Sequence, residues 1–277
     1  KEFYIDSSSV WVNCQHCAHS RLPLREKVEY YSRQRRLPEL SSSGQDLLND
    51  SKVLVVGAGG LGVPALTYLA SAGVGSIVIC DSDRVEISNL HRQTIYGYED
   101  IGKLKAEIAQ KKLSKLNPFI KIVASTDRLT FSNAERLVSS SDVVLDCCDN
   151  FKTKFLINDA CYFSKKKLVS ASIYTHEGHL ICWDFTFHQG CMRCLWPSIP
   201  EDDCIGTCAE VGVLGATVGT FGSMQAMEAI KFIVNSGRVD TKHLTLFNLM
   251  SHHFLKIEKA KDDQCPLCGV NKVIFNI

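Results

Sequence analysis

Several features that would assign this 277-residue chain to a function class are missing from it. The formal net charge is only +1, so the overall charge favours neither nucleic acid nor an anionic membrane as a partner. The longest uncharged run, Val211 to Met227, contains Gly, Thr, Ser and Gln and is too short and too polar for a transmembrane helix. The N-terminus lacks the apolar segment of a signal peptide, and no internal repeat or low-complexity tract is present. These absences lead us to expect a globular, cytoplasmic protein.

Cysteine is abundant by contrast, with 13 residues. Those inside apolar runs are expected to be buried thiols of a reducing compartment: Cys80, Cys147, Cys161 and Cys182. Six others form three Cys-x-x-Cys pairs, which are Cys14/Cys17, Cys191/Cys194 and Cys265/Cys268. In a non-secreted protein this spacing favours metal binding over disulfides.

Apolar runs and helical patterns alternate along most of the chain. We expect strands at 52–57, 76–81, 120–124, 142–146 and 168–171, and helices at 60–73, 102–116, 133–139 and 151–163. This alternation predicts an α/β fold with a Rossmann-like, doubly wound and mostly parallel sheet. An antiparallel C-terminal extension is expected from 178–185 onward, with strands at 244–248 and 252–257. Residues 1–29 have weak periodicity and are interpreted as an appendage to a main domain at 30–277.

One further helix is expected at 211–234. It is apolar on nearly every side, which is typical of a helix that is either fully buried or part of a subunit interface.

A glycine-rich loop follows the first expected strand and opens the next helix. Its glycines are Gly57, Gly59, Gly60 and Gly62. The first glycine permits a tight turn, the second lets phosphates approach the backbone, and the helix N-terminus presents free N–H groups to an anion. Asp81 ends the second strand, where a carboxylate can bind ribose hydroxyls. The loop and this acid together predict a nucleotide site.

On these features alone NAD would be the default ligand. The segment after the second strand favours ATP instead, because a triphosphate needs cations and polar groups around its larger negative charge. The candidate nucleotide-binding residues in this region are Asp83, Ser88, Asn89, Arg92 and Lys105.

The fourth strand ends in Asp146-Cys147-Cys148-Asp149-Asn150. Asp149 is a candidate ligand for Mg²⁺ on the phosphates, since hard cations prefer carboxylate oxygens, and Asn150 is a further candidate at the nucleotide. Both residue types also commonly cap helices, and a helix is expected from residue 151. The two roles are compatible.

With these segments in place, the chain resembles the ThiF/MoeB/HesA family, the bacterial relatives of ubiquitin-activating enzymes. The resemblance covers roughly residues 30–269. It is carried by YSRQ (31–34), GAGGLG (57–62), CDSDRVEISNLHRQ (80–93), IGKLK (101–105), LDCCDN (145–150), GCMRCLWP (190–197), TCAEVGVLG (207–215), GSMQAMEAIK (222–231) and CPLCG (265–269).

The resemblance implies a homodimeric adenylyltransferase that uses ATP to activate the terminal glycine carboxylate of a ubiquitin-like sulfur-carrier protein ending in Gly-Gly. By matching position, Gly60 and Asp81 contact the nucleotide and Asn89, Arg92 and Lys105 clamp the phosphates. Asp149 is then the residue for Mg²⁺, and Arg33 is the arginine that family members insert into the partner subunit's site. We see no rhodanese-like domain, so the sulfur would come from a separate donor. The carrier could serve thiamine, molybdopterin or tRNA thiolation.

Two alternatives remain open. The first is adenylation of another peptide C-terminus, although residues 1–29 are short for the recognition segment that such family members carry. The second is an NAD-dependent dehydrogenase, which the cations Arg92 and Lys105 disfavour.

The remaining cysteines divide into three groups. Cys191, Cys194, Cys265 and Cys268 supply four thiolates for a structural Zn²⁺ site, which the family shares. Cys208 matches the cysteine that links covalently to the carrier in ThiF-type members, and Cys204 competes for that role. The segment from Cys14 to His19 could hold a second metal, dock a partner, bridge a dimer or form an unstructured tail.

Overall fold

The computed structural model describes residues 24–187, 190–200 and 212–276. The strands are β1 Lys52–Val56, β2 Ser76–Cys80, β3 Lys121–Ser125, β4 Val143–Asp146, β5 Lys167–Tyr174, β6 Glu177–Asp184, β7 His243–Asn248 and β8 His253–Glu258. The α-helices are α1 Leu24–Tyr30, α2 Ser41–Asp50, α3 Gly62–Ala72, α4 Lys105–Leu116, α5 Phe131–Ser139, α6 Phe151–Phe163, α7 Met192–Leu195 and α9 Gly215–Ile233. Short 3-10 turns are η1 Gln34–Arg36, η2 Ile87–Asn89 and η3 Tyr98–Asp100.

All eight of these strands belong to one sheet, in the order β3-β2-β1-β4-β5-β6-β7-β8. The pairs from β3 to β5 are parallel, and the pairs from β5 to β8 are antiparallel. From β1 the chain adds β2 and β3 on one side of the sheet, and it then adds β4 and β5 on the other side of β1. The direction of strand addition therefore switches between β1 and β4. Ligands of open α/β sheets bind at the carboxyl ends of the two strands that flank such a switch point. The predicted doubly wound sheet with an antiparallel C-terminal extension is confirmed.

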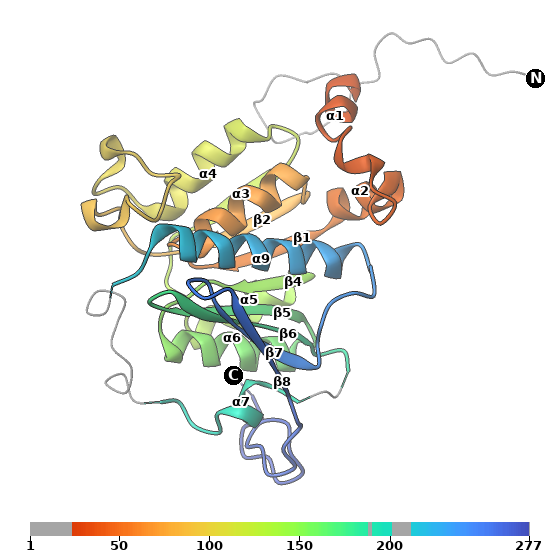
Figure 1. Ribbon diagram of the computed structural model, residues 1–277, viewed down its shortest axis with the longest axis vertical. Coiled ribbons are helices and arrows are strands. Elements are labelled where there is room, and N and C mark those ends of the chain that lie inside the picture. The colour runs from red at the N-terminus through yellow and green to blue at the C-terminus, as the bar shows by residue number, and fades with distance from the viewer. Residues whose placement is uncertain (1–23, 188–189, 201–211, 277) are drawn as a thin grey trace, which may run out of the picture.

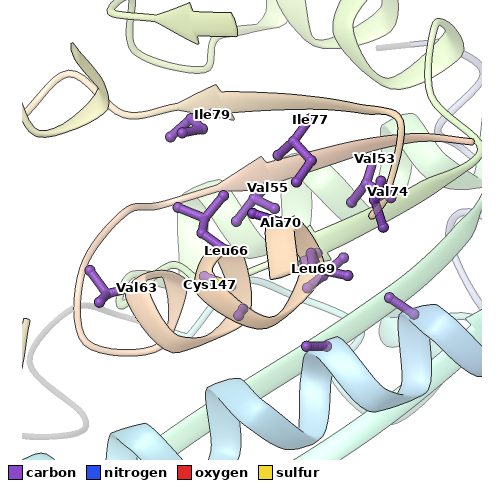
Figure 2. Packing of buried hydrophobic residues seen from close by; sticks show 14 of the residues in the cluster. Val53, Val55, Val63, Leu66, Leu69, Ala70, Val74, Ile77, Ile79 and Cys147 are labelled. Atoms are coloured by element: carbon purple, nitrogen blue, oxygen red, sulfur yellow. The ribbon is translucent and has the colours of Figure 1, made fainter. Parts of the chain in front are cut away.

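Helices cover both faces of the sheet, as Figure 1 shows, with α3, α4 and α9 on one side and α5 and α6 on the other. On the first side, α3 packs on β1 and β2 through Leu66, Leu69 and Ala70, which share one helix face because of their three- and four-residue spacing. Figure 2 shows these side chains facing Val55 of β1 and Ile77 of β2. β1 and β2 are apolar without alternation because helices bury both of their faces.

The long helix α9 lies beside α3 (Figure 1). Its backbone approaches the start of α3 so closely that a Cβ at Gly222 would lie 2.2 Å from the carbonyl oxygen of Leu61. Phe221 and Gln225 are fully buried, but Met227 is 58% exposed, so the helix is not fully buried within its own chain. None of the helices in the described part of the chain has both the length and the apolar character needed to cross a bilayer.

The opposite face holds a second core that includes Leu54 of β1, Ile157 of α6 and Trp183 of β6. Cys80, Cys147, Cys161 and Cys182 are buried, and every cysteine among the described residues is free. The prediction of buried thiols is therefore confirmed.

The segment before β1 packs against the C-terminal end of α3. Gln34 Nε2 donates to the carbonyl oxygen of Ala72 at 2.7 Å, and Gln45 Nε2 donates to the same oxygen at 3.1 Å. This segment thus lies at the end of α3 opposite to its glycine-rich start. The division between an appendage at 1–29 and a domain at 30–277 stays a prediction, since most of residues 1–29 lie outside the described residues.

Two expected helices begin three or more residues later than the pattern indicated. The helix expected from 102 begins at Lys105, because Gly102 has a φ of 83° and Leu104 forms an antiparallel bridge with Arg84. The helix expected from 211 begins at Gly215, because Gly212 has a φ of 78° and Val213 bridges Thr175. Left-handed glycines and β-bridges are both incompatible with helical backbone.

Candidate nucleotide site and cysteine cluster

The glycine loop joins the end of β1 to the start of α3. Gly57 has a φ of 97°, and a Cβ there would lie 2.7 Å from the carbonyl oxygen of Cys147. A Cβ at Gly62 would lie 1.9 Å from the carbonyl oxygen of Gly57. These two positions therefore require glycine for the turn itself. At Gly59 a Cβ would meet only the side-chain amide of Gln93, at 3.5 Å, so this glycine leaves space beside the loop.

Asp81 follows β2 and is bound to the glycine loop. Its Oδ2 accepts a hydrogen bond from the Ala58 N–H at 2.6 Å, and its Oδ1 accepts one from the Asp83 N–H at 2.8 Å. Burial raises the pKa of the Asp81 carboxyl above its ordinary value, although these two N–H donors act in the opposite direction. The loop and the predicted ribose-binding acid are thus held together before any nucleotide arrives.

Lys105 begins α4 beside this loop. Its side chain is only 8% exposed, and Nζ lies 3.1 Å from Oδ2 of Asp83, whose side chain is 70% exposed. Tyr96 donates from its hydroxyl to the carbonyl oxygens of Ala58 at 2.8 Å and of Lys105 at 3.3 Å, which ties the lysine to the glycine loop. The predicted phosphate clamp is therefore paired with the predicted nucleotide-binding acid Asp83.

The other polar candidates lie on the turn that contains η2. Asn89 is buried, and its Oδ1 accepts from the Glu86 N–H at 3.3 Å. Arg92 Nη1 donates to the Ser88 carbonyl oxygen at 2.8 Å and lies 2.9 Å from Nε2 of His91. In this arrangement Arg92 is folded back on its own turn, so binding a phosphate would require its guanidinium to exchange partners.

The turn after β4 carries the acid predicted for Mg²⁺. Asp149 is exposed, and it has no hydrogen bond or ion pair with the residues that the structure describes. Asn150 caps α6, since its Oδ1 accepts from the Thr153 N–H at 2.9 Å. The capping role considered for this pair falls to Asn150 and leaves the Asp149 carboxylate open.

Beneath this turn lies a buried ion pair that the sequence pattern did not reveal. Lys154 Nζ donates to Asp146 Oδ2 at 3.0 Å and to the Ala171 carbonyl oxygen at 2.7 Å. Ser170 Oγ donates to the same carboxylate oxygen at 2.6 Å. Gln225 of α9 donates from Nε2 to the Asp146 carbonyl oxygen at 2.8 Å. The network joins β4, β5, α6 and α9 at the end of β4, three residues before Asp149.

Arg33 is exposed and directly precedes η1, whose Gln34 contacts Ala72 at the far end of α3 from the glycine loop. A helix of eleven residues is roughly 16 Å long, so the structure does not bring Arg33 to the glycine loop of its own chain.

Four cysteines lie close together on the side of the sheet that α5 and α6 cover. The sulfur atoms of Cys191, Cys194, Cys265 and Cys268 all lie within 4.8 Å of one another, with 3.6 Å between Cys191 and Cys265 and 3.3 Å between Cys194 and Cys268. Sulfurs of a disulfide are about 2.05 Å apart, whereas thiolates on tetrahedral zinc, at about 2.3 Å from the metal, are roughly 3.8 Å apart. The cluster fits a four-coordinate metal site.

The first pair of this cluster is anchored to α6. Arg193 donates to both carboxylate oxygens of Asp159, at 2.7 to 3.1 Å, and its guanidinium lies 4.9 Å from the ring centre of Phe155. The Met192 N–H donates to Asn158 Oδ1 at 2.9 Å. The cluster is therefore connected through α6 to the turn that carries Asp149.

The remaining cysteine predictions fall outside the described residues. They concern Cys208 and Cys204 before α9, and Cys14 and Cys17 near the N-terminus.

Comparison with known proteins assigns this arrangement to a family. The model of the ThiF family matches residues 31–267. The chain belongs to the ThiF family. The predicted resemblance is confirmed over nearly the span on which it was based.

Relatives of this ThiF-family chain are named for adenylation of sulfur carriers. It is 41% identical to the sulfur carrier protein adenylyltransferase of Thermus thermophilus, over 88% of this chain and 92% of that protein. It is 41% identical to the sulfur carrier protein ThiS adenylyltransferase of Escherichia coli, over 86% of this chain and 94% of that protein. The adenylyltransferase and sulfurtransferase MOCS3 of Drosophila virilis is also 41% identical, but the chain spans only 56% of it.

Among solved structures, the E. coli protein MccB is similar to this ThiF-family chain, with a TM-score of 0.76 at 19% identity over 90% of this chain and 74% of MccB. At this identity the likeness shows the fold alone.

Proposed function

We propose that this chain uses ATP to adenylate the C-terminal carboxylate of a ubiquitin-like sulfur-carrier protein. The carboxylate oxygen attacks the α-phosphorus, forms an acyl-adenylate and releases pyrophosphate. The observation that carries the proposal is the 41% identity to a sulfur carrier protein adenylyltransferase over 88% of this chain. The NAD-dependent dehydrogenase alternative gives way to this family membership. Adenylation of another peptide C-terminus remains the second candidate, because the fold is shared with MccB.

The chemistry asks little of the protein in proton transfer, because a carboxylate is already ionised at neutral pH. The residues of the site instead position the reactants and neutralise charge on the phosphates. In our proposal the loop N–H groups receive the phosphates, and Lys105 exchanges Asp83 for a phosphate oxygen. Arg92 likewise leaves the Ser88 carbonyl for the ligand.

Asp149 is the residue that we propose for Mg²⁺. Its carboxylate is exposed, whereas the Asn150 Oδ1 is already bound to Thr153. One or two carboxylates together with substrate phosphates commonly hold Mg²⁺, which neutralises phosphate charge.

We propose that the four-cysteine cluster holds structural Zn²⁺. Four thiolates with no other ligand in the set form a closed site that has no position for a substrate. The cluster is anchored to α6 rather than to the glycine loop, which fits a metal that stabilises the fold.

We also propose that the chain acts as a homodimer with Arg33 reaching the partner's site. Arg33 lies near the C-terminal end of α3, too far from the glycine loop at the other end to reach the nucleotide site of its own chain. An open groove of about 800 Å³ between α3 and α9 is lined without charged residues, and Tyr68 and Met227 there are 56% and 58% exposed. We infer that a second copy covers this groove. Sulfur from a separate donor, and a covalent link to the carrier through Cys208 or Cys204, complete the proposal.

The test is ATP–pyrophosphate exchange with purified chain and a carrier ending in Gly-Gly. Exchange should require the carrier, and Asp149→Ala should abolish it. Asp46→Ala removes an exposed acid of α2, at the far end of α3, and should leave the exchange rate unchanged. Exchange that proceeds without the carrier, or that survives Asp149→Ala, would refute the proposed adenylation.

A further inference from the structure

Gln93 occupies a position in the nucleotide site that the proposed chemistry does not yet use. It ends the tight turn that follows η2, where its N–H donates to the Asn89 carbonyl oxygen at 3.0 Å and its own carbonyl oxygen accepts from Tyr96 N–H at 3.0 Å. Arg92 precedes it, and Tyr96 carries the hydroxyl that contacts both Ala58 and Lys105. The backbone thus fixes Gln93 between the glycine loop and the proposed phosphate clamp.

The side chain of Gln93 is buried but incompletely paired. Only 3% of the residue is exposed, and Oε1 has no hydrogen-bond partner among the described residues. Nε2 lies 3.5 Å from the point that a Cβ on Gly59 would occupy. The amide therefore faces Gly59, where a Cβ would meet no other atom within 4 Å.

The other buried glutamines among the described residues are paired. Gln45 donates from Nε2 to Ala72 and accepts from Gln34, and Gln225 donates to Asp146 and Val169 while accepting from the Cys147 thiol. A buried amide with an unpaired oxygen is unfavourable in the absence of ligand, and such groups in native proteins call for an explanation. The unpaired oxygen indicates that the Gln93 amide is not held for hydrogen bonds within the chain, and its donor atom Nε2 is the end that faces the glycine loop.

We propose that Gln93 is a nucleotide-binding residue, with its Nε2 donating a hydrogen bond to a phosphate oxygen of the nucleoside triphosphate held beside Gly59. Phosphate oxygens only accept hydrogen bonds, so the donor end of the amide must face them. This inference rests on the proposed ATP-dependent function and adds one residue to it. A phosphate oxygen cannot pair with Oε1, so this oxygen has no partner in the chain with or without the phosphate. The amide is therefore kept for the contact that its Nε2 makes rather than for hydrogen bonds within the core.

If Gln93 binds the nucleotide, replacing it should weaken ATP binding without lowering the stability of the ligand-free protein. If Gln93 only packs in the core, replacing it should lower the stability and leave ATP binding unchanged. Gln93→Met removes the unpaired oxygen and keeps the length of the side chain, so the thermal midpoint of the ligand-free protein should stay the same or rise. The Kd for ATP with Mg²⁺, measured by titration calorimetry on the whole chain, should rise about 10- to 100-fold, as expected for one lost hydrogen bond to a charged group. Gln93→Glu keeps the shape but offers a carboxylate to the phosphates, and it should weaken binding at least as much.

The matched control is Gln45→Met at the opposite end of α3. It breaks paired hydrogen bonds, so it should lower the thermal midpoint and leave the Kd for ATP unchanged. Gln93→Leu provides a second apolar replacement should methionine disturb the turn.

The proposal is overturned if wild-type protein binds ATP and both apolar Gln93 variants bind it equally well, whatever their midpoints. It is also overturned if Gln93→Met behaves as Gln45→Met does, with a lower midpoint and unchanged affinity. A wild-type chain that binds no ATP would overturn the proposed function together with this inference, so the two failures are distinguishable.

Discussion

The buried pair of Lys154 and Asp146 allows the sharpest prediction about stability. Lys154→Met keeps the aliphatic side chain but removes the ammonium that lies 3.0 Å from Asp146 Oδ2 and 2.7 Å from the Ala171 carbonyl oxygen. The side chains are 7% and 0% exposed, so water cannot replace the lost cation. The variant therefore leaves a carboxylate in the core without a counter-charge.

The magnitude follows from what remains around Asp146. Removing one partner of a buried ion pair typically costs 3–5 kcal/mol, a range that reflects how well the remaining charge is solvated. Asp146 retains the Ser170 hydroxyl at 2.6 Å and the Cys148 N–H at 3.1 Å. These two donors place Lys154→Met at the lower end, at about 3 kcal/mol of lost unfolding free energy.

The assay is urea denaturation followed by circular dichroism. With a slope of about 1–3 kcal/mol per molar urea, the expected loss moves the midpoint by about 1 M or more. Lys111→Met on the exposed face of α4 is the control and should shift the free energy by less than about 0.5 kcal/mol. The double variant Asp146→Asn with Lys154→Met removes both charges and should recover most of the loss.

The reasoning is refuted if Lys154→Met costs less than about 1 kcal/mol, because that value is typical of a solvent-exposed ion pair. A double variant that is less stable than Lys154→Met alone would equally contradict it.

Three further predictions concern the loop, the clamp and acid stability, and a fourth concerns the metal. Gly57→Ala forces a side chain onto a φ of 97° and against a carbonyl oxygen, so it should abolish ATP binding in calorimetry and lower the thermal midpoint. Lys105→Ala should weaken ATP binding by more than about tenfold, whereas Asp83→Ala should change it by less than about fivefold, since an exposed partner contributes little. Burial, followed by a nearby lysine, lowers the pKa of His179 to about 4, so the folded state binds fewer protons than the unfolded state between about pH 4 and pH 6.5. The free energy of unfolding should therefore fall as the pH drops through that window, by at most about 1.4 kcal/mol per pH unit, and His179→Phe should remove that part of the dependence. Fresh reduced protein should contain one zinc per chain by metal analysis and Cys194→Ser much less; wild-type protein well below one would contradict the proposed metal.

The parallel part of the fold could be predicted because each of its strands is a short apolar run. The expected strand at 52–57 and helix at 151–163 agree with β1 and α6 to within a residue. The strand expected at 168–171 is longer in the structure, where β5 spans Lys167–Tyr174. All eight residues of β5 pair with β6 in an antiparallel register, which is a non-local contact that periodicity does not report.

The site could be predicted less completely, because partners in three dimensions are not visible in spacing. The glycine loop and Asp81 were found from a local strand-loop-helix pattern, and the structure joins them. The ion pair of Asp146 and Lys154 was missed because the residues of its network come from three elements, β4, β5 and α6. The pairing of Lys105 with Asp83 was missed for the same reason, although a cation and an acid that both follow strand β2 are a signal that could have indicated it.

The four-cysteine cluster has a consequence for the unfolded chain. Its two halves are 74 residues apart in sequence, and α9, β7 and β8 lie between them. A metal that stays bound to all four thiolates would convert this stretch into a closed ring. Because a closed ring has fewer unfolded conformations than an open segment, closing a ring of this size raises the free energy of the unfolded state by about 4 kcal/mol. Strand β8, which is exposed along its whole length, adds little buried surface of its own. The edge of the sheet would then depend on ring closure rather than on packing, so chelation should open β8 to hydrogen exchange well before it disturbs β1.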